Sequence, residues 1–316
     1  MRKLSVLLFC LVFFGALLPV AAHADPAEDA YQRAQGATKK GDHETAFREY
    51  LRAAELGHLG AQIHLALSYA ASPSPEDFLE ARKWFRKGAE QGASSPQLAL
   101  ADMYREGDLD GRHRDYREAI RWYQKAATSQ NPRHRGEACH ALAEMHEQGL
   151  GVPKNPGQAL KWYRQAASLG EAESKYRLGY LYETGQGVGR DYRQAAQWYR
   201  EASAARVAVA RFRLGLLYER GLGVSASRAE ATNWYRRAAE GGYGPCQYAL
   251  GQKYEQGAGV PKDLVKAHLW YHLATRGLGD QALWDKAKAA RARVAAKLTP
   301  QQLARAQKLG KEWRPQ

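Results

Sequence analysis

A tryptophan recurs along this chain at almost constant spacing. The intervals between successive copies are 38, 40, 36, 36 and 36 residues, and six of the eight tryptophans fall in this one column. The column consists of Trp84, Trp122, Trp162, Trp198, Trp234 and Trp270. Self-similarity at a fixed period of this length is typical of stacked repeats. The chain is therefore expected to fold as a repeat array.

Small residues flank each tryptophan at fixed offsets. An alanine stands three residues before every copy, and four residues after it stands an alanine or, in the earliest copy, Gly88. Offsets of −3, 0 and +4 lie on one face of an α-helix. This pattern predicts a helix that packs closely on its neighbours, with the indole filling the space between small side chains.

A second helix is predicted between successive tryptophans. "YRLGYLYETG", "FRLGLLYERG" and "YALGQKYEQG" align on Tyr182, Tyr218 and Tyr254, with leucine at −4 and glycine at −3. The glycine costs about 1 kcal/mol of helix propensity relative to alanine. Its recurrence predicts a close crossing of two helices.

The connectors "GLGVPKN", "GQGVGRD", "GLGVSAS" and "GAGVPKD" carry helix stop and start signals. Their first glycine suits the left-handed residue that ends a helix. Their last residues are good N-caps for the next one: Asn155, Asp191, Ser227 and Asp263. A phosphate-binding loop is disfavoured, because the loop recurs in four consecutive copies and lacks the P-loop lysine.

These signals predict a right-handed all-α solenoid of about seven helix–turn–helix repeats over residues 25–279. The first copy is degenerate, with Glu49 in the tryptophan column. Residues 280–316 are expected to form two capping helices, the second opened by Thr299 as N-cap and Pro300 at its first position. Two stretches, 107–115 and 129–136, carry insertions. They are interpreted either as loops on a binding face or as tolerated insertions.

Residues 1–24 have the pattern of a signal peptide. Arg2 and Lys3 precede an apolar run from Leu4 to Val20, and Ala22 and Ala24 fit a cleavage site. A membrane anchor is the alternative, although about 17 apolar residues are few for a span. The mature chain is then expected to be exported, to the periplasm or outside the cell, without a transmembrane segment.

The charge balance favours an anionic partner. Removing residues 1–24 removes two of the 47 basic residues and none of the 33 acidic ones, which leaves 45 against 33. Such an excess attracts anionic partners or surfaces. For an exported chain we expect an acidic protein or an anionic polysaccharide, and not a nucleic acid.

The repeated phrase resembles the Sel-one-like repeat, a relative of the tetratricopeptide repeat. The resemblance is carried by "AESKYRLGYLYETGQGVGRDYRQAAQWYREAS" and its neighbours and covers roughly residues 29 to 279. It implies a non-catalytic scaffold that binds partner proteins of the cell envelope or the host. An alternative implied by a secreted, cysteine-rich branch is a β-lactam-binding or β-lactamase-like protein. That branch has a cysteine pair in each repeat, whereas this chain has only Cys139 and Cys246 after residue 24.

The sequence offers little catalytic chemistry. His268 and His272 stand four residues apart, a spacing that can bind a metal, but no glutamate follows the first and no third ligand is evident. His140 and His146 occupy columns that hold tyrosine elsewhere. Cys139 and Cys246 lie in helices three repeats apart, which places them too far apart for a disulfide. We therefore predict no catalytic residues, no cofactor and no metal.

Basic residues form further columns beside the tryptophans, at offsets −1, +2 and +3. These offsets share a helix face away from the apolar one. The predicted partner-binding residues are Lys83, Arg86, Arg121, Lys125, Lys161, Arg164, Arg200 and Arg236. The alternative is structural, because Glu147, Glu183, Glu219 and Glu255 recur near helix C-termini, where the helix dipole disfavours an anion. The arginine column at +2 is the natural candidate to compensate them.

Overall fold

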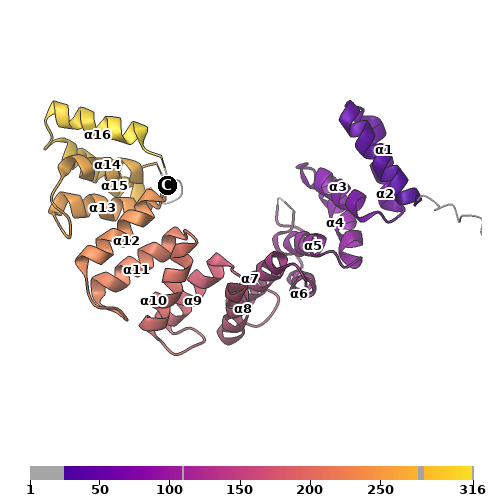
Figure 1. Cartoon of the computed structure of the whole chain (residues 1–316), viewed down its shortest axis with the longest axis horizontal. Helices are drawn as coiled ribbons and strands as arrows, with labels where there is room; N and C mark the ends of the chain where they lie inside the picture. The colour runs from indigo at the N-terminus through magenta and orange to yellow at the C-terminus, as the bar shows by residue number, and fades with distance from the viewer. Residues whose placement is uncertain (1–24, 109, 277–280, 315–316) are drawn as a thin grey trace, which may run out of the picture. The chain divides into compact units, whose positions relative to one another are not determined.

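The computed structural model describes residues 25–108, 110–276 and 281–314. In these residues the chain forms sixteen α-helices and no strand (Figure 1). The first eight are α1 (Pro26–Lys40), α2 (His43–Glu55), α3 (Leu59–Ala70), α4 (Pro75–Glu90), α5 (Ser94–Glu106), α6 (Tyr116–Ala126), α7 (Pro132–Gln148) and α8 (Pro156–Ser168). The others are α9 (Ala172–Thr184), α10 (Tyr192–Ala204), α11 (Ala208–Arg220), α12 (Arg228–Glu240), α13 (Gly244–Gln256), α14 (Leu264–Ala274), α15 (Gln281–Ala295) and α16 (Pro300–Glu312). The predicted signal peptide lies outside the described residues.

The helices pair as the repeat predicts. Seven consecutive hairpins, from α1/α2 to α13/α14, have the closest helix contacts in the structure, and α15 and α16 both pack against α14. The chain divides into two compact units at Gln91, inside the predicted array. The first unit contains α1 to α4 and the second contains α5 to α16. The predicted all-α solenoid of seven hairpins followed by two helices is confirmed.

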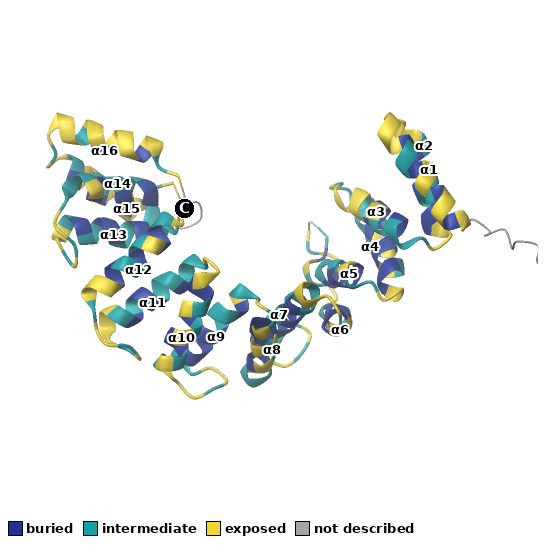
Figure 2. Cartoon of the chain, viewed as in Figure 1, coloured by how far each residue is buried: buried dark blue, intermediate teal, exposed yellow. Residues whose placement is uncertain are grey.

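The tryptophan helices bury the face that the sequence pattern marks. The alanines at −3 are fully buried, and the tryptophans are buried or half-buried (Figure 2). Trp198 of α10 packs against the apolar clusters of α7 to α9 and of α9 to α11. The indole N–H groups of five tryptophans are buried without an acceptor in the described residues: Trp84, Trp122, Trp162, Trp198 and Trp234. The indoles therefore stabilise the stack through their apolar surface.

The connectors contain the helix-ending glycines and the N-caps that the sequence predicts. The first glycine of each has a left-handed φ of 68° to 80°, as at Gly149 and Gly221. The predicted N-caps Asn155, Asp191, Ser227 and Asp263 all accept a hydrogen bond from the first turn of the next helix. Thr299 and Gln302 form a capping box at the start of α16. These signals are confirmed.

The glycine at −3 permits a close crossing within the hairpin. A Cβ atom on Gly179 of α9 would lie 2.6 Å from the Cδ1 and Cε1 atoms of Tyr199 of α10. Gly215 faces Tyr235 and Gly251 faces Tyr271 at 2.7 Å in the same way. The tyrosine ring thus occupies the space that the missing side chain leaves.

The two insertions differ in structure. The described residues of the first insertion, 107–108 and 110–115, form a loop between α5 and α6, with His113 at a positive φ of 61°. In residues 129–136, Asn131 caps α7, and Pro132 begins an extra first turn of that helix. The second insertion therefore mainly lengthens α7 and is only partly a loop.

Replacing Trp198 by alanine should remove a large apolar contact between neighbouring hairpins. We expect a loss of about 3–5 kcal/mol in the free energy of unfolding. Because coupling in repeat arrays is mainly between neighbours, faster hydrogen exchange should centre on residues 172–240. Trp198→Phe should cost much less, because the indole N–H has no acceptor to lose. Exchange that rises equally over both units would contradict the stacked arrangement.

Gly179→Ala should destabilise the protein although alanine is the better helix former. The added Cβ meets the Tyr199 ring, and overpacking of this kind costs about 1–3 kcal/mol. Gly157→Ala in α8 is the matched control, because the nearest atom, Asn155 Oδ1, would lie 3.5 Å from its Cβ. Thermal unfolding followed by circular dichroism measures both. An equal change in the two variants would argue against the close crossing.

Candidate interaction surface

The tyrosine that follows each tryptophan carries a buried polar contact. Tyr163, Tyr199, Tyr235 and Tyr271 are at most 2 % exposed. Each hydroxyl donates to the glutamate at the end of the preceding helix: Glu147 at 2.6 Å, Glu183 at 2.5 Å, Glu219 at 2.9 Å and Glu255 at 2.8 Å. Burial raises the pKa of all four tyrosines, so the hydroxyls stay neutral donors.

A basic residue completes each contact, from the first helix of the next hairpin or, after the last hairpin, from α15. Arg177 lies 2.8 Å from Glu147, and Arg213 lies 3.4 Å from Glu183. Lys253 lies 2.8 Å from Glu219, and Arg293 of α15 lies 2.8 Å from Glu255. Each glutamate thus links its own hairpin to the next. We call this Tyr–Glu–base arrangement the inter-repeat ladder.

The ladder tolerates changes of position. In the α5/α6 hairpin the acceptor of Tyr123 is Asp102, one helical turn before the glutamate column. In α13 the residue equivalent to Arg177 and Arg213 is Ala249, and Lys253, one turn further along, supplies the charge. In both hairpins a residue one helical turn away replaces the usual partner. The contact is therefore kept even where the residue at the usual repeat position differs.

The ion pairs lower the pKa of two of the glutamates, Glu255 and Glu219. Hydrogen bonds from Arg293 and Tyr271 hold the pKa of Glu255 below its usual value. Burial opposes such a shift at Glu219, but Lys253 and Tyr235 still hold the pKa of that carboxyl below its usual value. Both glutamates are therefore charged at neutral pH.

The alternative prediction, that the arginines at +2 pair with the glutamates, is wrong. The glutamates take their bases from the next hairpin's first helix or from α15, because those side chains reach the same edge of the stack. Arg164 and Arg200 instead donate to tyrosine hydroxyls of the next hairpin, Tyr182 at 2.6 Å and Tyr218 at 3.0 Å. Both arginines remain exposed.

The eight predicted partner-binding residues divide between the two units. Lys83 and Arg86 lie on α4 in the first unit, and the others lie on α6, α8, α10 and α12 in the second. Seven are exposed and Arg236 is half-buried. Lys83 pairs with Glu80 at 3.0 Å and Arg121 with Glu118 at 2.5 Å on their own helices. The Lys125 ammonium lies 3.8 Å from the centre of the Trp122 ring.

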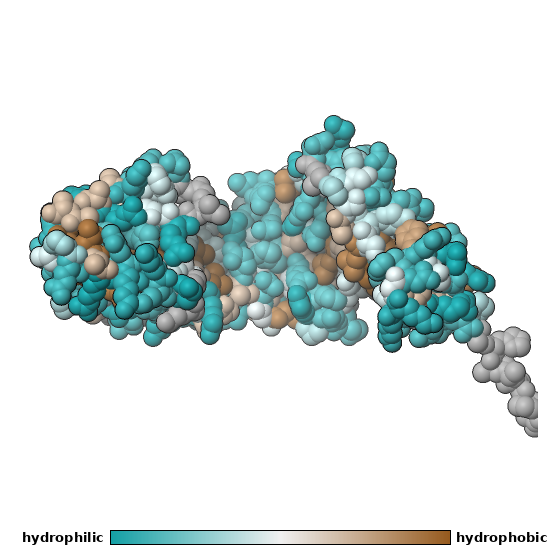
Figure 3. All heavy atoms as spheres, turned by 90° about the horizontal axis from the view of Figure 1, so that it is seen from above, coloured by the Kyte–Doolittle hydropathy of each residue, from teal (hydrophilic) through white to brown (hydrophobic). Residues whose placement is uncertain are grey.

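On the face drawn in Figure 3, hydrophilic residues cover most of the molecule, and hydrophobic residues are visible in small patches. We call Arg164, Arg200 and Arg236 of the second unit the arginine column. Its members come from α8, α10 and α12, the second helices of three consecutive hairpins.

Sequence reasoning missed the ladder. The tyrosine after each tryptophan was visible as part of the repeated Trp-Tyr pair, and its partner was visible as the glutamate column. The basic residues were harder to find, because Arg177, Arg213, Lys253 and Arg293 occupy three different positions of the repeat.

Two of the histidines and both cysteines singled out from the sequence lie in helices α7 and α13 of the second unit. His140 lies 2.8 Å from the Ser174 hydroxyl, and His146 is half-buried in a tyrosine column. Cys139 and Cys246 are buried free thiols in α7 and α13. Within the described part of the chain, no three His, Cys, Asp or Glu residues are grouped as a metal site. None of its helices is long and apolar enough to cross a bilayer.

The hairpin stack and its repeated contacts define an α-solenoid of helix–turn–helix repeats. The family profile of the Sel1 repeat matches residues 24–58, 60–92, 97–131, 136–171, 172–206, 208–243 and 244–277. The chain therefore belongs to the Sel1 repeat family. This confirms the resemblance from the sequence, including the degenerate first copy.

Curated relatives include regulators. The chain is 35 % identical over 147 residues to an exopolysaccharide production negative regulator of Rhizobium leguminosarum bv. viciae, a match that covers 42 % of this chain and 54 % of the relative. It is 31 % identical over 142 residues to chitin synthase regulatory factor 3 of Schizosaccharomyces pombe, which covers 43 % of this chain and 14 % of the relative. The chain thus matches about half or less of the length of these relatives.

Solved structures share the fold. A Sel1 repeat protein from Oxalobacter formigenes is 26 % identical with a TM-score of 0.62, and covers 81 % of this chain and 99 % of its own. A protective antigen present in uropathogenic Escherichia coli strains is 28 % identical with a TM-score of 0.50, and covers 91 % and 68 %. The Sel1 repeat architecture fits a protein-interaction scaffold. The β-lactamase alternative finds no support among these relatives.

Glu255→Gln should weaken the attachment of α15, because it removes the charge that holds Arg293. We expect a loss of about 1 kcal/mol at neutral pH. Since the folded-state pKa of Glu255 is lowered, its contribution is complete above about pH 4.5 and is lost as pH falls through the folded value. The difference in melting temperature between wild type and variant should therefore close in acid. A difference that stays constant down to pH 3 would mean that the charge is not the cause.

Proposed function

We propose that this protein is a non-catalytic, exported adaptor, periplasmic or secreted, that binds partner proteins of the cell envelope or the host through its basic surface. The observation that carries the proposal is that Arg164 and Arg200 of the arginine column are exposed, while Arg236 is half-buried. The glutamates have their bases elsewhere, so the column's charge is not neutralised by them.

The geometry of the column suits anionic groups. Each of three consecutive hairpins contributes one arginine, so the charges repeat once per hairpin along the second unit. Arg164 and Arg200 each give a hydrogen bond to a tyrosine hydroxyl, which orients the guanidinium. Their remaining N–H donors can bind carboxylates.

Exposed hydrophobic side chains in the first unit support a protein as the partner. Of the five large hydrophobic side chains that are clearly exposed in the described residues, four lie there: Phe47, Leu56, Leu67 and Leu79. Apolar side chains exposed to solvent can be buried by association with another protein. An acidic protein is therefore the preferred partner, and an anionic polysaccharide is the other ligand of the same charge.

The setting in the envelope rests on two supports. Residues 1–24 have the pattern of a signal peptide, which makes 25–279 the mature array and 280–316 its cap. Relatives that regulate exopolysaccharide production and chitin synthase are consistent with an adaptor that controls a polysaccharide-producing machine. In the cap, α15 buries Ala287, Ala290 and Val294, and exposes Asp285, Lys286, Lys288 and Arg293.

Affinity capture from envelope extract, followed by mass spectrometry, identifies the partner. Its binding should weaken steeply between 50 mM and 500 mM salt if the arginine column provides the contact. Turnover of a chromogenic β-lactam by the purified, metal-free protein would defeat the non-catalytic proposal.

Replacing Arg164, Arg200 and Arg236 together by glutamine should reduce affinity for the captured partner at least about tenfold, because two exposed charges and one half-buried charge are lost. The melting temperature should change little. Arg190→Gln, Arg193→Gln and Arg228→Gln, all exposed in the second unit, form a control with the same change in net charge. Calorimetric titration measures both variants. A lowered melting temperature with unchanged binding would show that the column is structural.

A further inference from the structure

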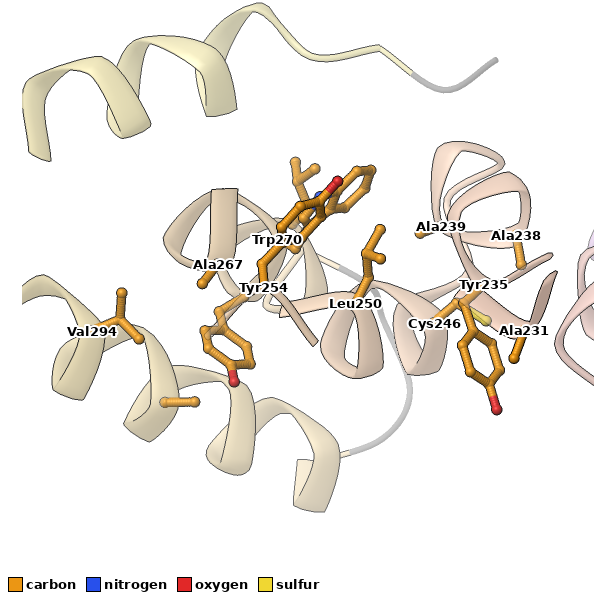
Figure 4. Packing of buried hydrophobic residues seen from close by; sticks show 13 residues of the cluster. Ala231, Tyr235, Ala238, Ala239, Cys246, Leu250, Tyr254, Ala267, Trp270 and Val294 are labelled. Carbon is orange, nitrogen blue, oxygen red and sulfur yellow. The ribbon is translucent and has the colours of Figure 1, made fainter. Parts of the chain in front are cut away.

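A cavity of about 470 Å³ lies among the last three helices. It is lined by His268 and His272 of α14, Arg291, Ala292 and Ala295 of α15, and Leu303, Gln307 and Lys311 of α16. Its volume is in the usual range for small-molecule sites. The cavity adjoins the apolar cluster of Figure 4, in which Val294 of α15 is near Ala267 of α14.

The cavity is basic. Its lining contains an arginine and a lysine but no acidic residue. Among the described residues, no ion pair is formed by Arg291 or Lys311. Lys311 also lines a second hollow, together with Arg276 and Arg314. Within residues 25–108, 110–276 and 281–314, no ion pair therefore balances the charges of Arg291 and Lys311.

The two histidines are held neutral and close to that charge. Arg291 Nη1 lies 2.9 Å from His272 Nδ1. A guanidinium can only donate, so His272 Nδ1 is the acceptor. Burial and the neighbouring Arg291 lower the pKa of His268 to about 4. His268 is 6 % exposed, and its Nδ1 is buried without a hydrogen-bond partner in the described residues.

A metal ion does not suit this site, although the histidine spacing suggested one. The Arg291 guanidinium is hydrogen-bonded to His272 and repels a second cation. An anion is favoured instead, and an arginine matches a carboxylate in a two-bond geometry. The apolar wall of Ala292, Ala295 and Leu303 favours a ligand that also carries a hydrocarbon part.

We propose that this cavity binds a small carboxylate with a short apolar chain, its carboxylate between Arg291 and Lys311 and its chain against Ala295 and Leu303. Two sources supply this chemistry. One is a free short-chain carboxylic acid, and the other is the C-terminal carboxylate of a peptide with an apolar last residue. The site is independent of the arginine column.

Calorimetric titration of the whole protein with hexanoate, N-acetyl-leucine and hexan-1-ol tests the proposal. At least one of the two carboxylates should bind with a Kd near or below about 1 mM, and hexan-1-ol at least about tenfold more weakly. Tighter binding of N-acetyl-leucine than of hexanoate identifies a peptide terminus as the source, and the reverse order identifies a free acid.

Arg291→Gln and Lys311→Gln should each weaken carboxylate binding about tenfold or more, because each removes a charged hydrogen-bond donor. Arg305→Gln and Lys308→Gln are the matched controls, since both residues are exposed on α16 and neither lines the cavity. Lys311 is also exposed, so its variant remains informative if Arg291→Gln fails to fold.

Four results would overturn the proposal. One is the absence of saturable binding of either carboxylate, and another is equal binding of hexan-1-ol. The third is an equal loss in the control variants. Stoichiometric Zn²⁺ binding that His268→Asn abolishes would also overturn it, because the cavity would then be a cation site.

Discussion

The buried tyrosine hydroxyl is the constraint on which the rest of the second unit depends. A hydroxyl removed from water needs a partner, and leaving it without one costs about 1–3 kcal/mol. The glutamate at the end of the preceding helix supplies the acceptor, at a position where the helix dipole is unfavourable. The base of the next hairpin compensates that charge. This contact therefore joins the two helices of a hairpin, stabilises the end of the first helix and holds the next hairpin in place.

Close contacts also explain why glycine recurs at two other positions of the repeat. At Gly179 and Gly251 the tyrosine ring approaches the preceding helix through the space that an absent side chain leaves. The second glycine of the connector meets the preceding hairpin, where a Cβ on Gly223 would lie 2.3 Å from the Tyr192 carbonyl carbon. The repeated phrase thus encodes contacts within and between hairpins.

Sequence reasoning predicted the fold well and the surface only partly. Helix faces, caps and connectors follow from local periodicity. Because each of them appears in several copies, a copy with an atypical sequence can be interpreted from the others. Which base reaches Glu183 depends on the packing of the next hairpin, and no spacing rule places Arg213 there in preference to Arg200. The cavity among α14, α15 and α16 was unpredictable for the same reason, since it arises where the repeat pattern ends and α16 packs on His272 through Gly310.

The most direct test of the ladder is a pair of double-mutant cycles on Glu183. The first combines Glu183→Gln with Tyr199→Phe, and the second combines Glu183→Gln with Arg200→Gln. Chemical denaturation should give a coupling energy of about 1 kcal/mol or more for the first pair and close to zero for the second. Coupling between Glu183 and Arg200 with none to Tyr199 would contradict the ladder and restore the pairing that the sequence suggested.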